Sequence, residues 1–142
     1  MSLGPAKAAI RAYIEGGFTT APLVWPNETH DLPAAPSPFV AIEVMGVTNS
    51  VRGIGEPGNR LFIHPGIILA HVFVPFGIGQ AAGDTVADAI GLLLQRKDIA
   101  APTLPQLVRT EDPTMIDGEL GSEDGNYWRV SVSIPFDFYY FG

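Results

Sequence analysis

One stretch of the sequence, residues 67–97, most constrains how this chain can fold. It begins with an apolar run from Ile67 to Pro75 that only His71 interrupts, which predicts a central strand buried on both faces. Pro75 ends this strand because proline has no backbone N–H to contribute to a sheet. Glycines follow, and from about Gln80 the apolar residues recur at helical spacing. A buried strand that feeds a helix packed back on it therefore forms the predicted core.

Two helices are predicted. The first begins near Pro5, buries one apolar face and ends at the Gly16–Gly17 pair. The second runs from about Gln80 to Lys97. Its charges suit the helix dipole, since Asp84 falls in the first turn and the pair Arg96 and Lys97 in the last turn.

The strands complete an α+β pattern. Alternating or continuous apolar residues predict strands at Phe39–Val47, Leu61–Phe76, Gln106–Glu111, Thr114–Leu120 and Tyr127–Phe138. We expect a mainly antiparallel sheet of four to five strands, with a mixed sheet left open, and two helices packed on one face. The length of 142 residues suits a single domain over residues 1–142.

Two long loops break this pattern. Residues 18–38 hold five prolines and no sustained period, so we expect a loop that Trp25 pins to the core. Residues 48–60 hold glycines and a proline but few apolar anchors, so we expect this loop to project from the domain.

The composition points to assembly and away from nucleic acid. The formal net charge of −7 argues against a nucleic-acid-binding surface, and only 16% of the residues are charged. With a mean hydropathy of +0.22, such a chain must bury surface against partners or be mostly core. There is no cysteine, no apolar signal segment and no run long enough to span a bilayer, so we expect a soluble cytosolic protein.

Residues that could carry chemistry form no recognisable site. The glycines at 77, 79 and 83 lie between a strand and a helix, but their spacing misses the dinucleotide fingerprint and Asp84 would repel a phosphate. The histidines at 30, 64 and 71 show no metal-ligand spacing with Asp31, Glu43 or Asp88. No serine lies in a nucleophile elbow. We therefore predict no catalytic residue, no metal ligand and no cofactor, and a tight turn at the glycines.

The end of the chain is unusually rich in rings. The side chains concerned are Phe136, Phe138, Tyr139, Tyr140 and Phe141. Successive strand residues point to opposite faces, so one chain cannot easily bury all five rings. They could complete the core of one chain, but we favour a subunit interface because aromatic residues are enriched in interface cores. Asn49, Arg52 and Arg60, in the projecting loop, are further candidates for contact with a partner.

Several short motifs, in order, resemble a known family. They are Pro38-Phe39-Val40, Gly58, Val72-Phe73-Val74-Pro75-x-Gly77-x-Gly79, Ala87-Asp88, and Tyr127-Trp128-x-Val130-Ser131-Val132-Ser133-Ile134-Pro135-Phe136. Together they span most of the chain. The sequence resembles the tail terminator-like proteins of long-tailed phages and prophages, the minor tail protein U group.

This resemblance implies a non-enzymatic virion protein that forms a homo-oligomeric ring, usually a hexamer. Such a ring caps the tail tube, ends its polymerisation and prepares head joining. The implied partners are the tail tube protein and a head-completion or neck protein, without specific nucleic-acid binding or a membrane. The implied location is the virion tail, and the bacterial cytoplasm during assembly. A neck or connector protein of the same machinery, and a small ligand-binding or enzymatic domain that uses the turn at 77–83, remain alternatives.

Overall fold

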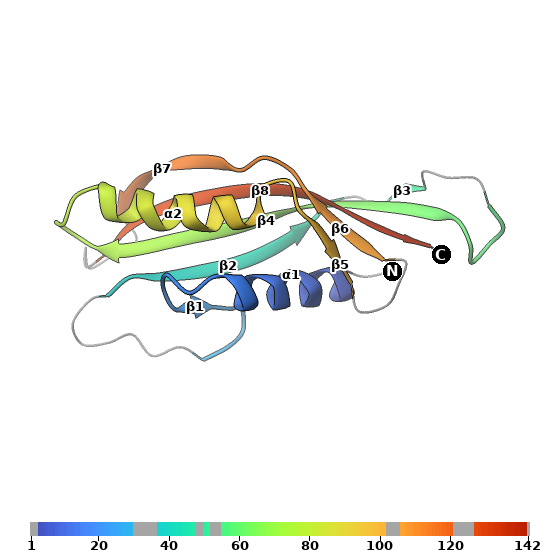
Figure 1. The fold of residues 1–142 in the computed structure, drawn as a ribbon, viewed down its shortest axis with the longest axis horizontal. Helices are drawn as coiled ribbons and strands as arrows, with labels where there is room; N and C mark the ends of the chain where they lie inside the picture. Colours follow the sequence, from blue (N-terminus) through green and yellow to red (C-terminus); the bar gives the residue numbers. More distant parts are fainter. Residues whose placement is uncertain are drawn as a thin grey trace.

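The fold is a single curled sheet with two helices, drawn in Figure 1. The computed structural model describes residues 3–29, 37–47, 50–51, 55–101, 106–120 and 127–141. In chain order the elements are α1 (Gly4–Gly17), β1 (Leu23–Val24), β2 (Phe39–Gly46), β3 (Ser50–Val51), β4 (Leu61–Pro75), α2 (Ala81–Leu94), β5 (Asp98–Ala100), β6 (Leu107–Thr110), β7 (Thr114–Leu120) and β8 (Tyr127–Phe141). The α+β class predicted from the sequence is confirmed.

The strands form one sheet in the order β1-β2-β4-β8-β6-β5, with β3 paired to β4 and β7 paired to β8. Every pair is antiparallel except β1 with β2. The prediction of a mainly antiparallel sheet is therefore confirmed. The predicted number of strands was too low, because β1, β3 and β5 contain only two or three residues each and carry no alternating pattern.

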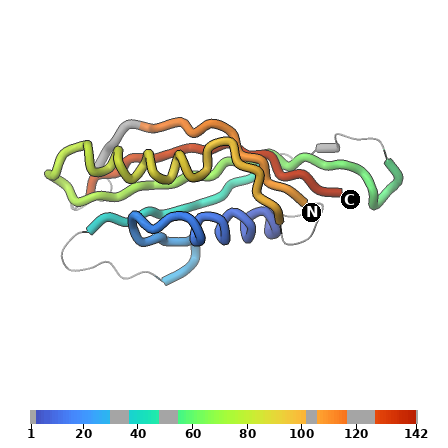
Figure 2. The backbone as a smooth tube through the Cα atoms, viewed as in Figure 1, coloured from blue at the N-terminus to red at the C-terminus, as the bar shows by residue number. Residues whose placement is uncertain are grey.

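Strands β4 and β8 are the spine of the sheet. Each has 15 residues, and they pair along their whole length, from Leu61 opposite Phe141 to Pro75 opposite Tyr127. At about 3.3 Å per residue the pair is about 46 Å long. It runs along the long axis of the molecule, as the smooth backbone trace of Figure 2 also shows. The two ends of this spine are therefore far apart.

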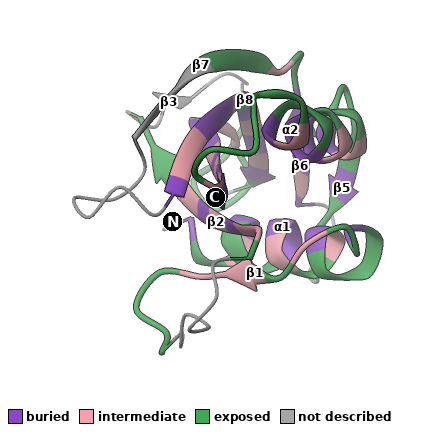
Figure 3. Cartoon of the chain, turned by 90° about the vertical axis from the view of Figure 1, so that its left-hand side faces the viewer, coloured by how far each residue is buried: buried purple, intermediate pink, exposed green. Residues whose placement is uncertain are grey.

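The two faces of the spine differ in burial. Ile68, Ala70, Val72 and Val74 point to the helices and are fully buried. The residues that alternate with them, from Ile67 to Phe73, are only half-buried. The expectation of a strand buried on both faces is wrong because both helices pack on the same side of the sheet; Figure 3 shows this distribution of burial.

The helices begin and end close to the predicted positions. α1 has proline in its first turn and buries Ala6, Ala9, Ile10 and Ile14. α2 has Asp84 in its first turn, as predicted, but it ends at Leu94 and has no basic residue in its last turn. The prediction for Arg96 and Lys97 is therefore wrong. Arg96 has a positive φ of 48°, which a continuing α-helix does not allow.

Parts of both predicted loops are visible. In the first loop, the partly buried Trp25 packs on the core, as expected, and Arg11 lies over its ring. In the second, β3 pairs with β4 at Phe62 and Ile63, whereas residues 48–49 and 52–54 lie outside the described residues. None of the described helices is both long and apolar enough to cross a membrane.

Candidate interaction surface

The alternation of β8 divides the terminal rings between the two faces of the sheet. Phe136, Phe138 and Tyr140 point toward the helices and are buried in the core of one chain. Phe138 stacks on Tyr140, and Tyr140 stacks on Phe62 of β4. The expectation that these three rings lie at an exposed interface is corrected by this burial. Alternate residues of a strand point to the same face, so these three rings continue the buried series Val130, Val132 and Ile134 along β8.

The other two rings lie on the opposite face. Tyr139 is half-buried, with the Arg109 guanidinium 5.7 Å from its ring centre. Phe141 is 44% exposed and lies at the end of the spine, opposite Leu61. Of the five predicted rings, Phe141 is therefore the one that remains available to a partner.

The structure describes one of the three predicted loop residues. Arg60 is exposed, and its Nε donates a hydrogen bond to the carbonyl oxygen of Gly55 at 3.1 Å. This contact holds the guanidinium beside its own loop. Asn49 and Arg52 lie outside the described residues.

His71 joins three neighbouring strands on the face without helices. Its Nδ1 lies 2.8 Å from the Ser131 hydroxyl on β8, and its Nε2 lies 3.3 Å from a carboxylate oxygen of Glu43 on β2. His71 is therefore a partly buried histidine with hydrogen-bond partners on both sides. Ser131 is buried, so its hydroxyl could not reach a substrate as a catalytic nucleophile must. This cluster satisfies polar groups within the sheet.

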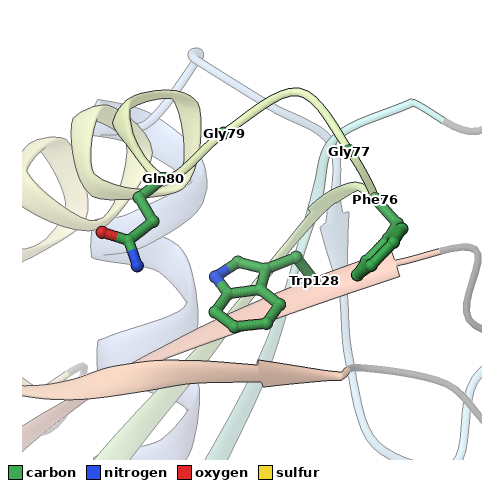
Figure 4. Close-up of a pocket in the computed structure, with 5 residues that line it drawn as sticks. All are labelled: Phe76, Gly77, Gly79, Gln80 and Trp128. Carbon is green, nitrogen blue, oxygen red and sulfur yellow. The ribbon is translucent and has the colours of Figure 1, made fainter.

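The glycine turn between β4 and α2 forms a small pocket. Gly77 and Gly79 have φ of 92° and 91°, in the region that favours glycine, and they carry the chain over the end of the sheet. The pocket has a volume of about 220 Å³ and is lined by Phe76, Gly77, Gly79, Gln80 and Trp128 (Figure 4). It opens at the end of the spine opposite to Phe141.

The lining of the pocket is mainly apolar, and Gln80 is its one polar side chain apart from the Trp128 indole. The indole Nε1 of Trp128 is buried and has no hydrogen-bond partner. Phe76 and Ile78, in the turn, are 55% and 57% exposed. The sequence analysis considered only the glycines of this turn. Trp128 is brought to the turn by the pairing of β8 with β4, which places it opposite Val74, so local sequence carries no sign of this pocket.

Three arginines among the described residues form ion pairs at the surface. Arg11 binds Glu15 and Glu28, Arg109 binds Asp98, and Arg96 binds Asp112 through two hydrogen bonds of 2.7 and 2.8 Å. The Arg96 guanidinium, helped by the Gln95 amide, lowers the pKa of Asp112 to about 2. Within the described ranges, no group of three or more His, Asp and Glu side chains is arranged to hold a metal ion.

The comparisons with known proteins rest on structure. No family model and no curated protein sequence matches this chain. One solved structure has a TM-score of 0.68 at 19% identity, with 96% of this chain and 97% of that chain covered. Another match is a chain of the virion of a native gene transfer agent particle. Its TM-score is 0.57 at 15% identity, with 98% of this chain and 100% of that chain covered. At these identities the likeness shows a shared fold.

Proposed function

We propose that this protein is a non-enzymatic structural protein of a phage-like virion. The observation that carries the proposal is the likeness to a virion chain over 98% of this chain and the whole of that one. A match over both full lengths means that the domain is shared without a large insertion in either protein. The glycine-turn pocket has no charged residue in its lining, and the Ser131 hydroxyl of the His71 cluster is buried.

Within the virion, the proposed role is that of the tail terminator. The protein would form a ring, usually of six copies, that caps the tail tube, ends its growth and presents a surface to the neck protein. The order of short motifs along the sequence supports this role. A ring needs two different patches on each subunit, because its contacts are heterologous. The exposed apolar residues at both ends of the spine, Phe76 and Ile78 at one and Phe141 at the other, could supply such patches.

The acidic character of the chain fits a ring through which DNA passes. The net charge of −7 would keep the phosphate backbone from binding. Only 16% of the residues are charged, and physiological salt screens the charges at the surface, so electrostatic repulsion between copies in a ring would be weak.

The test combines purified protein with tail tubes of the phage or prophage that encodes it, viewed by negative-stain electron microscopy. Rings on tube ends, and tubes that no longer elongate when tube protein is added, are the expected result. Rings that bind only the portal end of filled heads would favour the neck or connector role. A protein that stays monomeric at high concentration and ignores both tubes and heads would contradict the proposal.

A further inference from the structure

Strand β2 has an unpaired edge over more than half of its length. β1 pairs with it only at Val40 and Ala41, whereas β2 continues to Gly46. The Val40 N–H donates to the Pro22 carbonyl oxygen at 2.9 Å, so every second residue of β2 turns its backbone N–H and C=O toward the side of β1. From Val44 onward, these groups face no other strand among the described residues.

Two residues explain why β1 stops so early. In the parallel register, the next bond would join the Ile42 carbonyl oxygen to the N–H of residue 26, but residue 26 is proline and has no N–H. Asn27 follows with a positive φ of 58°, which turns the chain out of the strand. The edge of β2 is therefore left open by local sequence.

This open edge carries none of the usual protection against pairing. Residues 42–46 contain no lysine and no proline, the residues that commonly keep other strands away. Met45 and Val47, at the end of the edge, are 46% and 57% exposed. Such an edge is typical of a sheet that receives a strand from a partner.

A groove runs beside the edge, between β2 and α1. Its volume is about 340 Å³, and Figure 1 shows α1 lying along β2. Ile42 and Val44 line it from β2, Lys7 and Arg11 line it from α1, and Trp25, which follows β1, lines it as well. A strand added to β2 would bind through its backbone and turn every second side chain into this groove.

The charges of the groove select an acidic side chain. Arg11 is already bonded to Glu15 and Glu28. Lys7, one turn before Arg11 on α1, is exposed and forms no ion pair with any of the described residues. A carboxylate beside Lys7 would complement this charge.

The order of the lining residues sets the spacing of the side chains. A Cβ atom added at Gly46 would lie 2.5 Å from Leu3 Cδ1, so the start of α1 lies toward the end of β2. Lys7 therefore lies toward that end, and Trp25 lies toward the end where β1 stops. One turn of helix advances about 6 Å, close to the distance of about 6.6 Å between alternate residues of a strand. An apolar side chain beside Trp25 and a carboxylate beside Lys7 are then two residues apart.

The groove fits a free segment better than a second copy of this chain. Every described strand already belongs to the sheet of its own chain. A strand within a sheet carries a neighbouring strand about 4.8 Å away, for which a groove between one helix and one strand leaves no room. An extended segment outside any sheet brings no such neighbour.

We propose that the α1–β2 groove binds an extended segment of a partner protein. The segment adds a strand to the free edge of β2 and places an apolar side chain beside Trp25 and a carboxylate beside Lys7. A chain terminus or a linker of the partner supplies it. This inference does not rest on the tail terminator role, because the groove specifies the chemistry of the segment and not the identity of its owner.

Two short peptides test the groove directly. Acetyl-Thr-Ile-Thr-Glu-Thr-amide and its reversed sequence, acetyl-Thr-Glu-Thr-Ile-Thr-amide, cover the two directions in which a strand can add. One of them should bind with a Kd of roughly 0.1 to 1 mM. Alanine in place of the isoleucine should weaken binding at least about tenfold, and lysine in place of the glutamate at least about fivefold. Failure of both peptides, or indifference to these changes, would overturn the proposal.

Amide hydrogen exchange shows whether the bound peptide forms a strand. The peptide should slow exchange of the Val44 amide at least about tenfold. The amides of Glu43 and Met45, which face β4 in the register, should not change. A peptide that binds without protecting Val44 would contradict strand addition.

Methylation of the peptide backbone provides a second test that needs no protein variant. A single N-methyl group is placed at the second or at the third residue of the binding peptide. One of these amides faces β2 and the other faces away, because successive residues of a strand alternate. One methyl group should therefore weaken binding at least about fivefold and the other should leave it unchanged. Equal effects would overturn strand addition.

The two lysines of the chain form a matched pair for the charge. Lys7→Ala should weaken binding of the glutamate peptide about threefold. Lys97→Ala, at an exposed position beyond α2, should leave binding unchanged. Lys7→Glu should reverse the preference, so that the lysine peptide binds more tightly than the glutamate peptide. Equal effects of the two alanine variants would contradict Lys7 as the partner of the carboxylate.

Three further results assign the occupant and separate this inference from the proposed function. Protection of the Val44 amide that appears without peptide as the protein concentration rises would assign the edge to a second copy and overturn the partner segment. Peptide binding by a protein that never caps tubes would leave this inference standing. Capped tubes from a protein that binds neither peptide would overturn this inference and leave the terminator role standing.

Discussion

The ring of Phe136 lies directly over Gly66, its partner across the β4–β8 pair. A Cβ atom added at Gly66 would lie 2.4 Å from the Phe136 Cζ and 2.6 Å from the Met45 carbonyl oxygen. The second of these contacts is with backbone and cannot turn aside. The absence of a side chain at position 66 is therefore what allows a phenylalanine to fill the core at the middle of the sheet.

Gly66→Ala should destabilise the protein by about 1–3 kcal/mol, because the added methyl group overpacks the core and presses on β2. Urea unfolding monitored by circular dichroism measures this loss. Gly16→Ala is the matched control, since nothing lies within 4 Å of a Cβ at that helical position. The control should be neutral or slightly stabilising. Equal stability of the two variants would contradict the packing of Phe136 on Gly66.

Because alternate rings of β8 are buried, substitutions at two nearby phenylalanines should change the free energy of unfolding by very different amounts. Phe138→Ala should cost about 3–5 kcal/mol, because a fully buried ring leaves a cavity. Phe141→Ala should change the free energy of unfolding by less than about 0.5 kcal/mol, as is usual for exposed positions. Thermal and urea unfolding check both values. A small effect at Phe138 would mean that this ring is not in the core of a single chain.

Thr110 of β6 binds the segment that follows α2. Its buried hydroxyl donates to the Leu94 carbonyl oxygen at 2.5 Å and accepts from the Lys97 backbone N–H at 2.7 Å. Thr110→Val keeps the shape but removes both bonds, so it should cost about 1–3 kcal/mol.

Hydrogen exchange at the Lys97 amide distinguishes this hydrogen bond from side-chain packing. In Thr110→Val the Lys97 amide should exchange faster, whereas in Thr110→Ser, which retains the hydroxyl, its protection should remain. Fast exchange in the serine variant as well would show that the methyl group, and not the hydroxyl, fastens this segment.

The Arg96–Asp112 pair predicts a specific acid response. The folded pKa of Asp112, about 2, lies below its ordinary value of about 3.9. A depressed folded pKa contributes stability that is fully present above about pH 4 and is lost as the pH falls toward 2. Carboxyl-detected NMR titration measures this pKa directly. Arg96→Gln should raise it toward the ordinary value, whereas Arg109→Gln, which removes the partner of Asp98, should leave it unchanged.

Much of the architecture is predictable because it depends on local periodicity. The apolar face of residues 6–14, the helical spacing after Gln80 and the alternation from Tyr127 onward each identify an element without reference to the rest of the chain. Short pieces such as β1 and β3 are different. Two residues contain no period, and they become strands only because a long neighbour offers them hydrogen bonds.

The sequence by itself determined the α+β class, both helices, the long strands and the shortage of charge that suggests assembly. It could not show which rings are exposed, because that depends on which face of β8 the helices cover. Nor could it show the pocket, whose walls at Phe76 and Trp128 lie about 50 residues apart in the chain and meet only through the pairing of β4 with β8. Periodicity is a property of one segment, whereas burial and juxtaposition arise from contacts between segments, and only the tertiary structure decides these.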